Sequence, residues 1–212
     1  MTLFAEIAMS LDGYVAGPNQ SEENPLGEGG EQLHEWGFAL KEWREPHGRE
    51  GGETNASSEV LAESLERTGA GIMGRKMFGG GPGPWGKEPW QGWWGDEPPF
   101  KHPVFVLTHH EREPLVLGDT EFTFVTEGIE AAAEQAADAA VERDVKVAGG
   151  ANAIQQYLDA GLADELELHV VPVLFGGGER LLDSVDPGGI ELEQTRVVEA
   201  PGVTHLKYRV AS

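Results

Sequence analysis

The sequence predicts an α/β domain of three layers, in which helices cover both faces of a mixed, mostly parallel sheet. Strand-like apolar runs alternate with helix-like segments along most of the chain, which is typical of parallel strands joined by crossover helices. Three strand-like runs then follow one another near the C-terminal end, which indicates antiparallel strands at one edge. No linker or internal repeat divides the 212 residues, so we expect one domain over 1–212.

The first part of the chain predicts one strand and two helices. LFAEIAM (3–9) is a buried strand, and SLDGYVAGPNQ after it is a loop rich in turn residues. Apolar residues recur at helical spacing over Glu31–Arg44, which predicts an amphipathic helix. A glycine-rich, charged surface loop (45–56) then leads to a second helix around residues 60–68, which a glycine ends.

The middle of the chain alternates strands with helices around an irregular insertion. AGIMG (70–74) is a strand that runs into a helical turn, and VFVLT (104–108) is the next strand. Between them lies a Trp/Gly-rich insertion around 80–100 without regular periodicity. FTFV (122–125) is a further strand, and an alanine-rich helix covers 129–140.

The last part of the chain is rich in strands. VKVAGGANAIQQYL (145–158) is a strand, a pair of glycines and a helix in direct succession. ELELHVVPVLF, IELEQTRVVEA and VTHLKYRVA are strands, and Pro201-Gly202 joins the last two into a hairpin.

The composition limits the classes of partner. Acidic residues outnumber basic ones by 37 to 15, which gives a formal net charge of −22 and disfavours nucleic acid and anionic membranes. The acidity fits either adaptation to high salt or an ordinary acidic cytosolic protein. Without cysteine, a visible signal peptide or a long apolar run, we expect a cytoplasmic protein without disulfides.

The pair Gly149-Gly150 is the first feature that points to a ligand. A strand that ends in glycine and feeds a helix presents unpaired N–H groups at the positive end of the helix dipole, which suits a phosphate. The alternative is a plain tight turn. The literal GxGxxG at 81–86 contains two prolines and precedes no helix pattern, so we discount it.

Two further strand ends carry groups that bind phosphate. GIMGRKMF places Arg75 and Lys76 at a helix start, where cations are unfavourable unless an anion is near. VLTHHER supplies the hydroxyl of Thr108, two imidazoles and a guanidinium. Three such strand ends in an acidic protein favour a dinucleotide at the carboxyl edge of the sheet. This interpretation requires the turns at Arg75 and Gly149-Gly150 to lie at the same edge.

Five motifs in order resemble the dihydrofolate reductase fold: IAMSLDGYVAG, GIMGRKMF, VFVLTHH, VKVAGGANAIQQYL and LELHVVPVLFGGG. SLDG and P-x-L-x-G-G-G are most similar to the reductase (C-terminal) domain of the riboflavin biosynthesis bifunctional deaminase/reductase proteins. The resemblance covers nearly the whole chain except residues 20–52 and the Trp/Gly-rich insertion.

The resemblance implies an NADPH site and a cis Gly149–Gly150 peptide. Two positions match backbone contacts to the nicotinamide carboxamide, and three groups of positions match the turns that hold the phosphates and the adenine ribose, with Arg75 the expected partner of the 2′-phosphate. The implied cofactor-binding residues are Ala8, Val15, Gly74, Arg75, Lys76, Met77, Leu107, Thr108, His109, Gly149, Gly150, Ala151, Asn152 and Ile154.

The candidate catalytic residues are Asp12 and His169. Asp12 either contacts a polar substrate ring or only forms the Asp-Gly turn. His169 either donates a proton near neutral pH or is a structural histidine. The helix predicted at 31–44 offers Glu31 and Glu35, which either anchor a pterin, as folate reduction requires, or are simply exposed.

Together these features predict an NADPH-dependent reductase that transfers hydride to a small heteroaromatic or imine-type substrate, pterin- or pyrimidine-like. The alternatives are a 5-amino-6-(5-phosphoribosylamino)uracil reductase, dihydrofolate reductase proper, a catalytically silent dinucleotide-binding protein, or a flavin in the same crevice. We expect no metal site, because no ligand spacing supports one. The resemblance implies a homodimer paired through sheet edges, and the tryptophans of the insertion form either a lid or an anchor.

Overall fold

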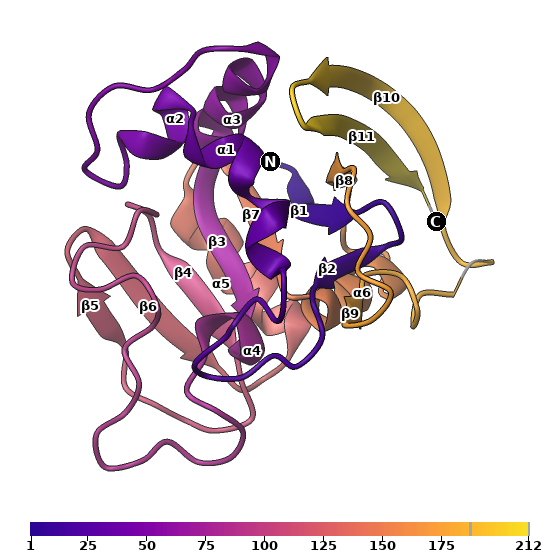
Figure 1. The fold of residues 1–212 in the computed structure, drawn as a ribbon. Coiled ribbons are helices and arrows are strands. Elements are labelled where there is room, and N and C mark those ends of the chain that lie inside the picture. The colour runs from indigo at the N-terminus through magenta and orange to yellow at the C-terminus, as the bar shows by residue number, and fades with distance from the viewer. Residues whose placement is uncertain (187, 212) are drawn as a thin grey trace.

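The computed structural model of the chain describes residues 1–186 and 188–211, within which nine strands form one sheet in the order β10-β11-β8-β1-β7-β3-β4-β6-β5 (Figure 1). Two further strands, β2 and β9, form a separate two-stranded sheet. In chain order the strands are β1 (Leu3–Ser10), β2 (Tyr14–Ala16), β3 (Thr68–Gly74), β4 (Val104–Leu107), β5 (Leu115–Leu117), β6 (Thr120–Val125), β7 (Asp144–Gly149), β8 (Glu165–Val171), β9 (Glu179–Arg180), β10 (Glu191–Ala200) and β11 (Val203–Ala211). The helices are η1 (Gly30–Leu33, a 3-10 turn), α1 (Glu35–Phe38), α2 (Lys41–Arg44), α3 (Ala56–Arg67), α4 (Arg75–Phe78), α5 (Ile129–Ala140) and α6 (Ala151–Asp159).

The pairing confirms the predicted mixed, mostly parallel sheet. The six strands from β8 to β6 are parallel neighbours, and β10 and β11 form the predicted antiparallel C-terminal hairpin beside β8. A short antiparallel strand, β5, closes the other edge. The carboxyl ends of β1, β3, β4 and β7 therefore meet at one edge of the sheet, where ligands of open α/β sheets bind.

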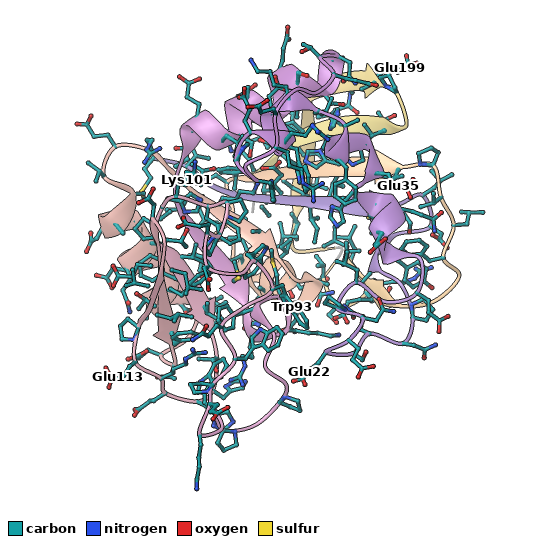
Figure 2. All side chains as sticks on the ribbon, turned by 60° about the vertical axis from the view of Figure 1, so that its left-hand side comes forward. Glu22, Glu35, Trp93, Lys101, Glu113 and Glu199 are labelled. Carbon is teal, nitrogen blue, oxygen red and sulfur yellow. The ribbon has the colours of Figure 1, made fainter. Side chains whose placement is uncertain are left out.

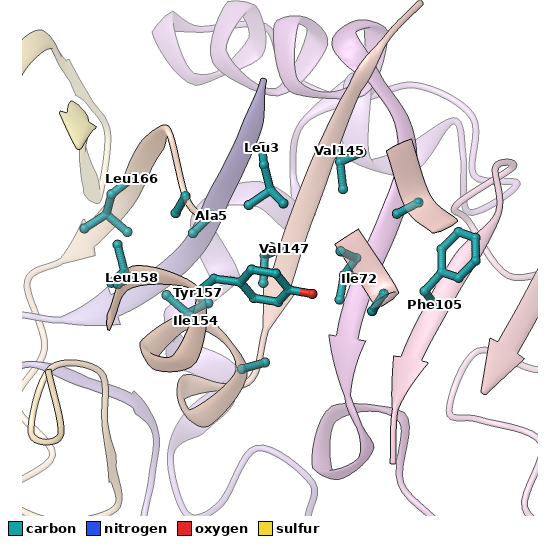
Figure 3. Packing of buried hydrophobic residues seen from close by; sticks show 14 of the residues in the cluster. Leu3, Ala5, Ile72, Phe105, Val145, Val147, Ile154, Tyr157, Leu158 and Leu166 are labelled. Carbon is teal, nitrogen blue, oxygen red and sulfur yellow. The ribbon is translucent and has the colours of Figure 1, made fainter. Parts of the chain in front are cut away.

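Helices α5 and α6 cover one face of the sheet and bury the main apolar core (Figure 3). Residues that alternate along the central strands, such as Ala5 and Val147, point to this face, as the two-residue period of a strand requires. Tyr157 of α6 is fully buried among them, and its hydroxyl donates a hydrogen bond to the Ile129 carbonyl oxygen.

Helix α3 covers the opposite face, which completes the predicted three layers. The helix begins at an N-capping residue, Asn55, whose side chain accepts a hydrogen bond from the Ser57 N–H, while the Ser58 hydroxyl accepts one from the Asn55 N–H. At the other end of α3, the Arg67 guanidinium lies 3.5 Å from the centroid of the Phe4 ring and pairs with Glu165 of β8. This face of the sheet is therefore more polar than the face under α5 and α6.

The single helix predicted over Glu31–Arg44 is wrong. The segment forms η1, α1 and α2, because Leu40 adopts an extended backbone between α1 and α2. Lys41 N–H donates to the Glu53 carbonyl oxygen, and Glu53 N–H donates to the Ala39 carbonyl oxygen, so a β-bridge replaces the helical hydrogen bonds. The bridge leaves Leu40 fully buried, and this burial favours the break.

Three short strands also depart from the prediction. β2 lies within the predicted loop after β1 and pairs with β9, and β5 precedes β6 as a hairpin partner. β8 ends at Val171, earlier than the predicted run to Phe175. β2, β5 and β9 have only two or three residues each, so tertiary pairing decides them more than local pattern does.

Tryptophans anchor the Trp/Gly-rich insertion to its own domain. The indole N–H groups of Trp85, Trp90 and Trp93 donate to the carbonyl oxygens of His110, Phe78 and Met77, respectively. The insertion therefore packs over α4 and the segment after β4, next to the predicted phosphate turns.

The β10–β11 hairpin contains a β-bulge at Thr195. Gln194 pairs with Tyr208, whereas Arg196 pairs with Lys207, so Thr195 is an extra residue on β10. The Thr195 hydroxyl donates to the Lys207 carbonyl oxygen at 3.1 Å.

The acidic side chains lie largely on the outside of the molecule, as Glu113 and Glu199 illustrate (Figure 2). Glu31 and Glu35 are exposed as well. Among the helices that the structure describes, none combines the length and the apolar character needed to cross a membrane.

Candidate active site

The turns after β3 and β7 lie directly against each other at the carboxyl edge of the sheet. A methyl group built on Gly74 would lie 3.6 Å from the Ala153 Cβ atom, 3.8 Å from Gly150 N and 3.9 Å from the Gly149 carbonyl oxygen. Gly74 immediately precedes Arg75, so the requirement that the two predicted phosphate turns share one edge is met.

The backbone at Gly149 and Gly150 has the conformation that an anion cradle needs. The peptide bond between them is cis, as expected, and Gly149 has a φ of 127°, which disfavours any residue with a side chain. Gly150 is the N-capping residue of α6, and no side chain caps this helix. The Ala153 N–H donates to the Gly150 carbonyl oxygen, so the N–H groups of Ala151 and Asn152, at the positive end of the helix dipole, are the ones available to a phosphate.

Arg75 lies beside the end of β4, and its guanidinium is hydrogen-bonded to other groups of the chain. Its guanidinium donates to the Thr108 hydroxyl at 3.1 Å and to the carbonyl oxygens of Gly79 and Gly80 at 3.2 and 3.1 Å. It also stacks on Trp85, 3.1 Å from the ring centroid. Burial and the nearby Arg112 charge lower the pKa of Arg75, so an anionic ligand here would be electrostatically favourable.

The remaining predicted phosphate-binding residues surround these two turns. Lys76 is exposed and forms an ion pair with Glu179 of β9. The Met77 sulfur lies 3.4 Å from the position of a methyl group on Gly149. His109 is exposed, whereas the structure places Leu107 half-buried, Ala151 and Ile154 buried, and Asn152 on the exposed side of α6.

The two residues expected beside the nicotinamide lie on β1 and β2. Ala8 is buried in an apolar cluster with Leu33 and Val171, against which Trp36 packs. Val15 is half-buried and packs against the main core. The segment from η1 to α1 thus covers the β1–β8 region next to the predicted cofactor turns.

Asp12, in the loop after β1, connects this loop by hydrogen bonds to the loop after β8 at the same edge of the sheet. Its carboxylate accepts hydrogen bonds from the Ser10 hydroxyl at 2.7 Å and from the N–H groups of Phe175 and Gly176. The Ser10 hydrogen bond, with support from the two N–H groups, lowers the pKa of Asp12 to about 2, although partial burial opposes the shift. Asp12 is therefore ionised at neutral pH and holds the loop after β8.

His169 lies on the buried face of β8, in register with Ala8 of β1. Its Nε2 atom lies 2.9 Å from a carboxylate oxygen of Glu6, and its Nδ1 atom lies 2.8 Å from His205 Nδ1. Asp12 and His169 have different hydrogen-bond partners, and no hydrogen bond joins the two predicted catalytic residues.

Sequence reasoning missed the polar partners of His169 under α3. Glu6 is buried between His169 and Lys146, and His205 is buried between His169 and Ser57. Burial alone would raise the pKa of Glu6, but the Lys146 ammonium and the His169 hydrogen bond outweigh it and hold the pKa well below its usual range. The signal that could have revealed this cluster is Glu6 itself, a charged residue within the apolar run LFAEIAM.

No cluster of three or more His, Cys, Asp or Glu side chains suited to a metal ion occurs in residues 1–186 and 188–211.

A profile of the RibD C-terminal domain family matches residues 1–206. The chain belongs to this family. No curated protein sequence matches it.

Solved structures share the fold of this RibD C-terminal domain at low sequence identity. A protein from Shewanella sp. PV-4 assigned to riboflavin biosynthesis has 20% identity and a TM-score of 0.64, with complete coverage of both chains. The Thermotoga maritima diaminohydroxyphosphoribosylaminopyrimidine deaminase/5-amino-6-(5-phosphoribosylamino)uracil reductase has 14% identity and a TM-score of 0.59 over 99% of this chain and 56% of its own. Enterococcus faecalis dihydrofolate reductase, complexed with NADP(H), has 13% identity and a TM-score of 0.51 over 100% of this chain and 97% of its own.

Proposed function

We propose that the chain is an NADPH-dependent reductase that transfers hydride to a small heteroaromatic or imine-type molecule, pterin- or pyrimidine-like. The observation that carries this proposal is that the glycine turns after β3 and β7 are neighbours, so that a methyl group on Gly74 would touch Gly149, Gly150 and Ala153. Membership of the RibD C-terminal domain family supports it, as does the fold shared with an NADP(H)-bound dihydrofolate reductase.

The residues present fit the diphosphate of such a cofactor. Gly149 has no side chain that would block a phosphate, and no side chain caps the first turn of α6. The N–H groups of this turn would therefore bind the phosphate oxygens. A 2′-phosphate would bind Arg75 and Thr108, and it would compete with the Gly79 and Gly80 carbonyl oxygens for the guanidinium. The bound cofactor would supply the hydride, and the chain would orient it and exclude water.

Binding of the cofactor is tested first. Titration of the purified protein with NADPH should quench tryptophan fluorescence, because Trp85 stacks on Arg75. Arg75→Gln should weaken NADPH binding by about tenfold and leave NADH binding nearly unchanged, since one charge-assisted contact to the 2′-phosphate is lost. Arg196→Gln, on β10, is the matched control. If neither nucleotide binds, the proposed function is wrong.

Turnover then distinguishes the acceptors. Loss of reduced-nicotinamide absorbance is followed with dihydrofolate, with 5-amino-6-(5-phosphoribosylamino)uracil and with simple cyclic imines. Turnover of the ribosylaminouracil would assign the step that the Thermotoga relative carries out, whereas turnover of imines alone would assign a different acceptor.

A dinucleotide-binding protein without turnover is the second candidate. It is favoured by the internal hydrogen bonds of Asp12 and His169, which engage the carboxylate and both ring nitrogens. NADPH binding without oxidation across the acceptor panel would support this candidate.

A further inference from the structure

Arg112, in the loop between β4 and β5, is a half-buried arginine whose hydrogen-bonding capacity is mostly unused. Its guanidinium donates one hydrogen bond, to the Trp90 carbonyl oxygen. A guanidinium has five N–H donors, so four of them have no partner within residues 1–186 and 188–211. Burial lowers the pKa of Arg112, which means that water solvates its charge incompletely. An anion beside this guanidinium would satisfy both the free donors and the charge.

The neighbouring Arg75 is bound much more fully by its own chain. Its N–H groups donate to the Thr108 hydroxyl and to the carbonyl oxygens of Gly79, Gly80 and Gly83. At most one of the five donors of Arg75 then remains for a ligand. Arg112 therefore offers more free N–H groups at this edge of the sheet than Arg75, the residue that the sequence pointed to.

The two arginines lack acidic partners in an acidic protein. Neither Arg75 nor Arg112 forms an ion pair with a carboxylate in the described part of the chain, although acidic residues outnumber basic ones by 37 to 15. Carboxylates pair with many other basic side chains, including Arg67, Lys76, Lys146, Arg196, Lys207 and Arg209. After burial, the Arg112 charge is the second cause that lowers the pKa of Arg75, so the two guanidiniums repel each other. A bound anion would offset this repulsion.

Trp85 of the insertion fixes the two guanidiniums relative to each other. Arg75 lies 3.1 Å and Arg112 lies 4.6 Å from the Trp85 ring centroid. The indole N–H donates to the His110 carbonyl oxygen at 3.0 Å, and the His110 N–H donates to the Thr108 hydroxyl at 3.2 Å. The same hydroxyl accepts the hydrogen bond from Arg75. Both guanidiniums are therefore held at the segment that follows β4.

The strand order places this segment at one end of the proposed cofactor site. The positions expected beside the nicotinamide lie on β1 and β2, and the turns expected to hold the diphosphate follow β7 and β3. The next strand of the sheet is β4 (Figure 1). A dinucleotide that extends along this carboxyl edge would therefore reach the end of β4 with its adenosine half.

We propose that Arg112 is a specificity-determining residue that binds the 2′-phosphate of NADPH together with Arg75, and that Trp85 positions the two guanidiniums. The inference rests on the proposed reductase function. A phosphate monoester carries a charge of about −1.5 to −2 at neutral pH, which two guanidiniums match. Arg112 has enough free N–H groups to donate two parallel hydrogen bonds to it. NADH has a hydroxyl at this position and would leave both positive charges uncompensated.

A purely structural role of Arg112 leads to a different expectation. Its guanidinium also lies 4.6 Å from the Phe124 ring centroid and 5.7 Å from that of Phe78, so it stabilises the aromatic cluster under the insertion. Loss of these contacts alone would lower the free energy of unfolding and weaken NADPH and NADH equally. The ratio of the two affinities therefore distinguishes the roles.

Isothermal titration calorimetry with NADPH and with NADH measures this ratio. Arg112→Gln should weaken NADPH binding about 30-fold, because charge-assisted hydrogen bonds are lost, and should leave NADH binding within about twofold. Arg112→Lys keeps the charge without the paired donors and should recover only part of the NADPH affinity. Arg143→Gln, at an exposed position before β7, is the matched control and should change neither affinity.

Adenosine 2′,5′-bisphosphate and adenosine 5′-monophosphate differ only in the 2′-phosphate and test the site without nicotinamide. The parent protein should prefer the bisphosphate, and the preference should fall as the pH drops through about 6, because the 2′-phosphate then takes up a proton. Arg112→Gln should lose most of this preference. Trp85→Phe keeps an aromatic ring and should retain it, whereas Trp85→Leu should not.

Equal weakening of NADPH and NADH by Arg112→Gln, or unchanged NADPH binding, would overturn the inference and leave the reductase proposal standing. If circular dichroism shows that Arg112→Gln is unfolded, Arg112→Lys decides: the parent ratio of affinities in that variant would exclude the paired contact. If the parent protein binds neither dinucleotide, the proposed function is wrong. The bisphosphate and monophosphate titrations then still decide whether the two arginines form an anion site.

Discussion

Mild acid should destabilise the native protein through two buried histidines. Burial lowers the pKa of His34 to about 4, and burial together with the His169 charge lowers the pKa of His205 to about 4. The unfolded chain binds protons at these positions from the ordinary value of 6.5 downward. Between pH 6.5 and 4 the unfolded state therefore holds more protons than the native state, and the free energy of unfolding falls as the pH falls.

The magnitude follows from the size of these changes in proton affinity. A tenfold change in proton affinity corresponds to ~1.4 kcal/mol. Solvent screening reduces the contribution of each histidine by about half. Protonation of the two histidines should then lower the free energy of unfolding by ~3 kcal/mol between pH 7 and 4. This stability is fully present above pH 6.5.

Urea unfolding followed by tryptophan fluorescence between pH 7.5 and 4.5 measures this effect. High salt suppresses the repulsion among surface carboxylates, since the Debye length falls to ~3 Å at 1 M ionic strength. The double variant His34→Gln/His205→Gln should flatten the profile, whereas His109→Gln at an exposed position should not. A parent protein whose free energy of unfolding stays constant over this range would refute the reasoning, as would a double variant with the parent slope.

Four further outcomes are expected. Gly149→Ala should destabilise the protein by ~1–2 kcal/mol in urea unfolding because φ is positive there, whereas Gly150→Ala meets open space and should cost less. Trp85→Leu should lose ~2 kcal/mol and expose the insertion to limited proteolysis, because an indole hydrogen bond and two guanidinium contacts disappear. Asp12→Asn should accelerate amide hydrogen exchange in the loop after β8, since an amide oxygen replaces the carboxylate that accepts both N–H groups. Light scattering should give twice the chain mass of 22.9 kDa if the predicted homodimer forms, and a mass of one chain would contradict it.

The strands and long helices of the core were predictable because apolar periodicity decides them. The alanines of α5 and the alternating residues of β7 have only one way to bury their apolar side chains against a sheet. The break at Leu40 was not predictable, because the competing hydrogen bonds come from Glu53, which local spacing does not reveal. The same holds for β2 and β9, which exist only because they pair with each other.

Some features of the candidate site could likewise be predicted from the sequence, and others could not. The glycine turns were visible because backbone geometry at Gly149 excludes most other residues. The surroundings of Arg75 were not, since its carbonyl partners depend on how the insertion folds. The buried polar cluster around His169 was also hidden, because His205 and Ser57 lie 148 positions apart in the sequence and meet only in the folded chain.

The Thr195 bulge marks the position at which this hairpin can lose one residue and keep the pairing on either side of it. Gln194 and Arg196 pair with consecutive residues of β11, so removal of Thr195 would leave the flanking pairs in place and straighten β10. Loss of Val198, between the bulge and the turn, would instead move Arg196 one position along the ladder and to the other face, and Arg196 would lose its partner Glu63. Homologous hairpins that are one residue shorter should therefore carry the deletion at this position.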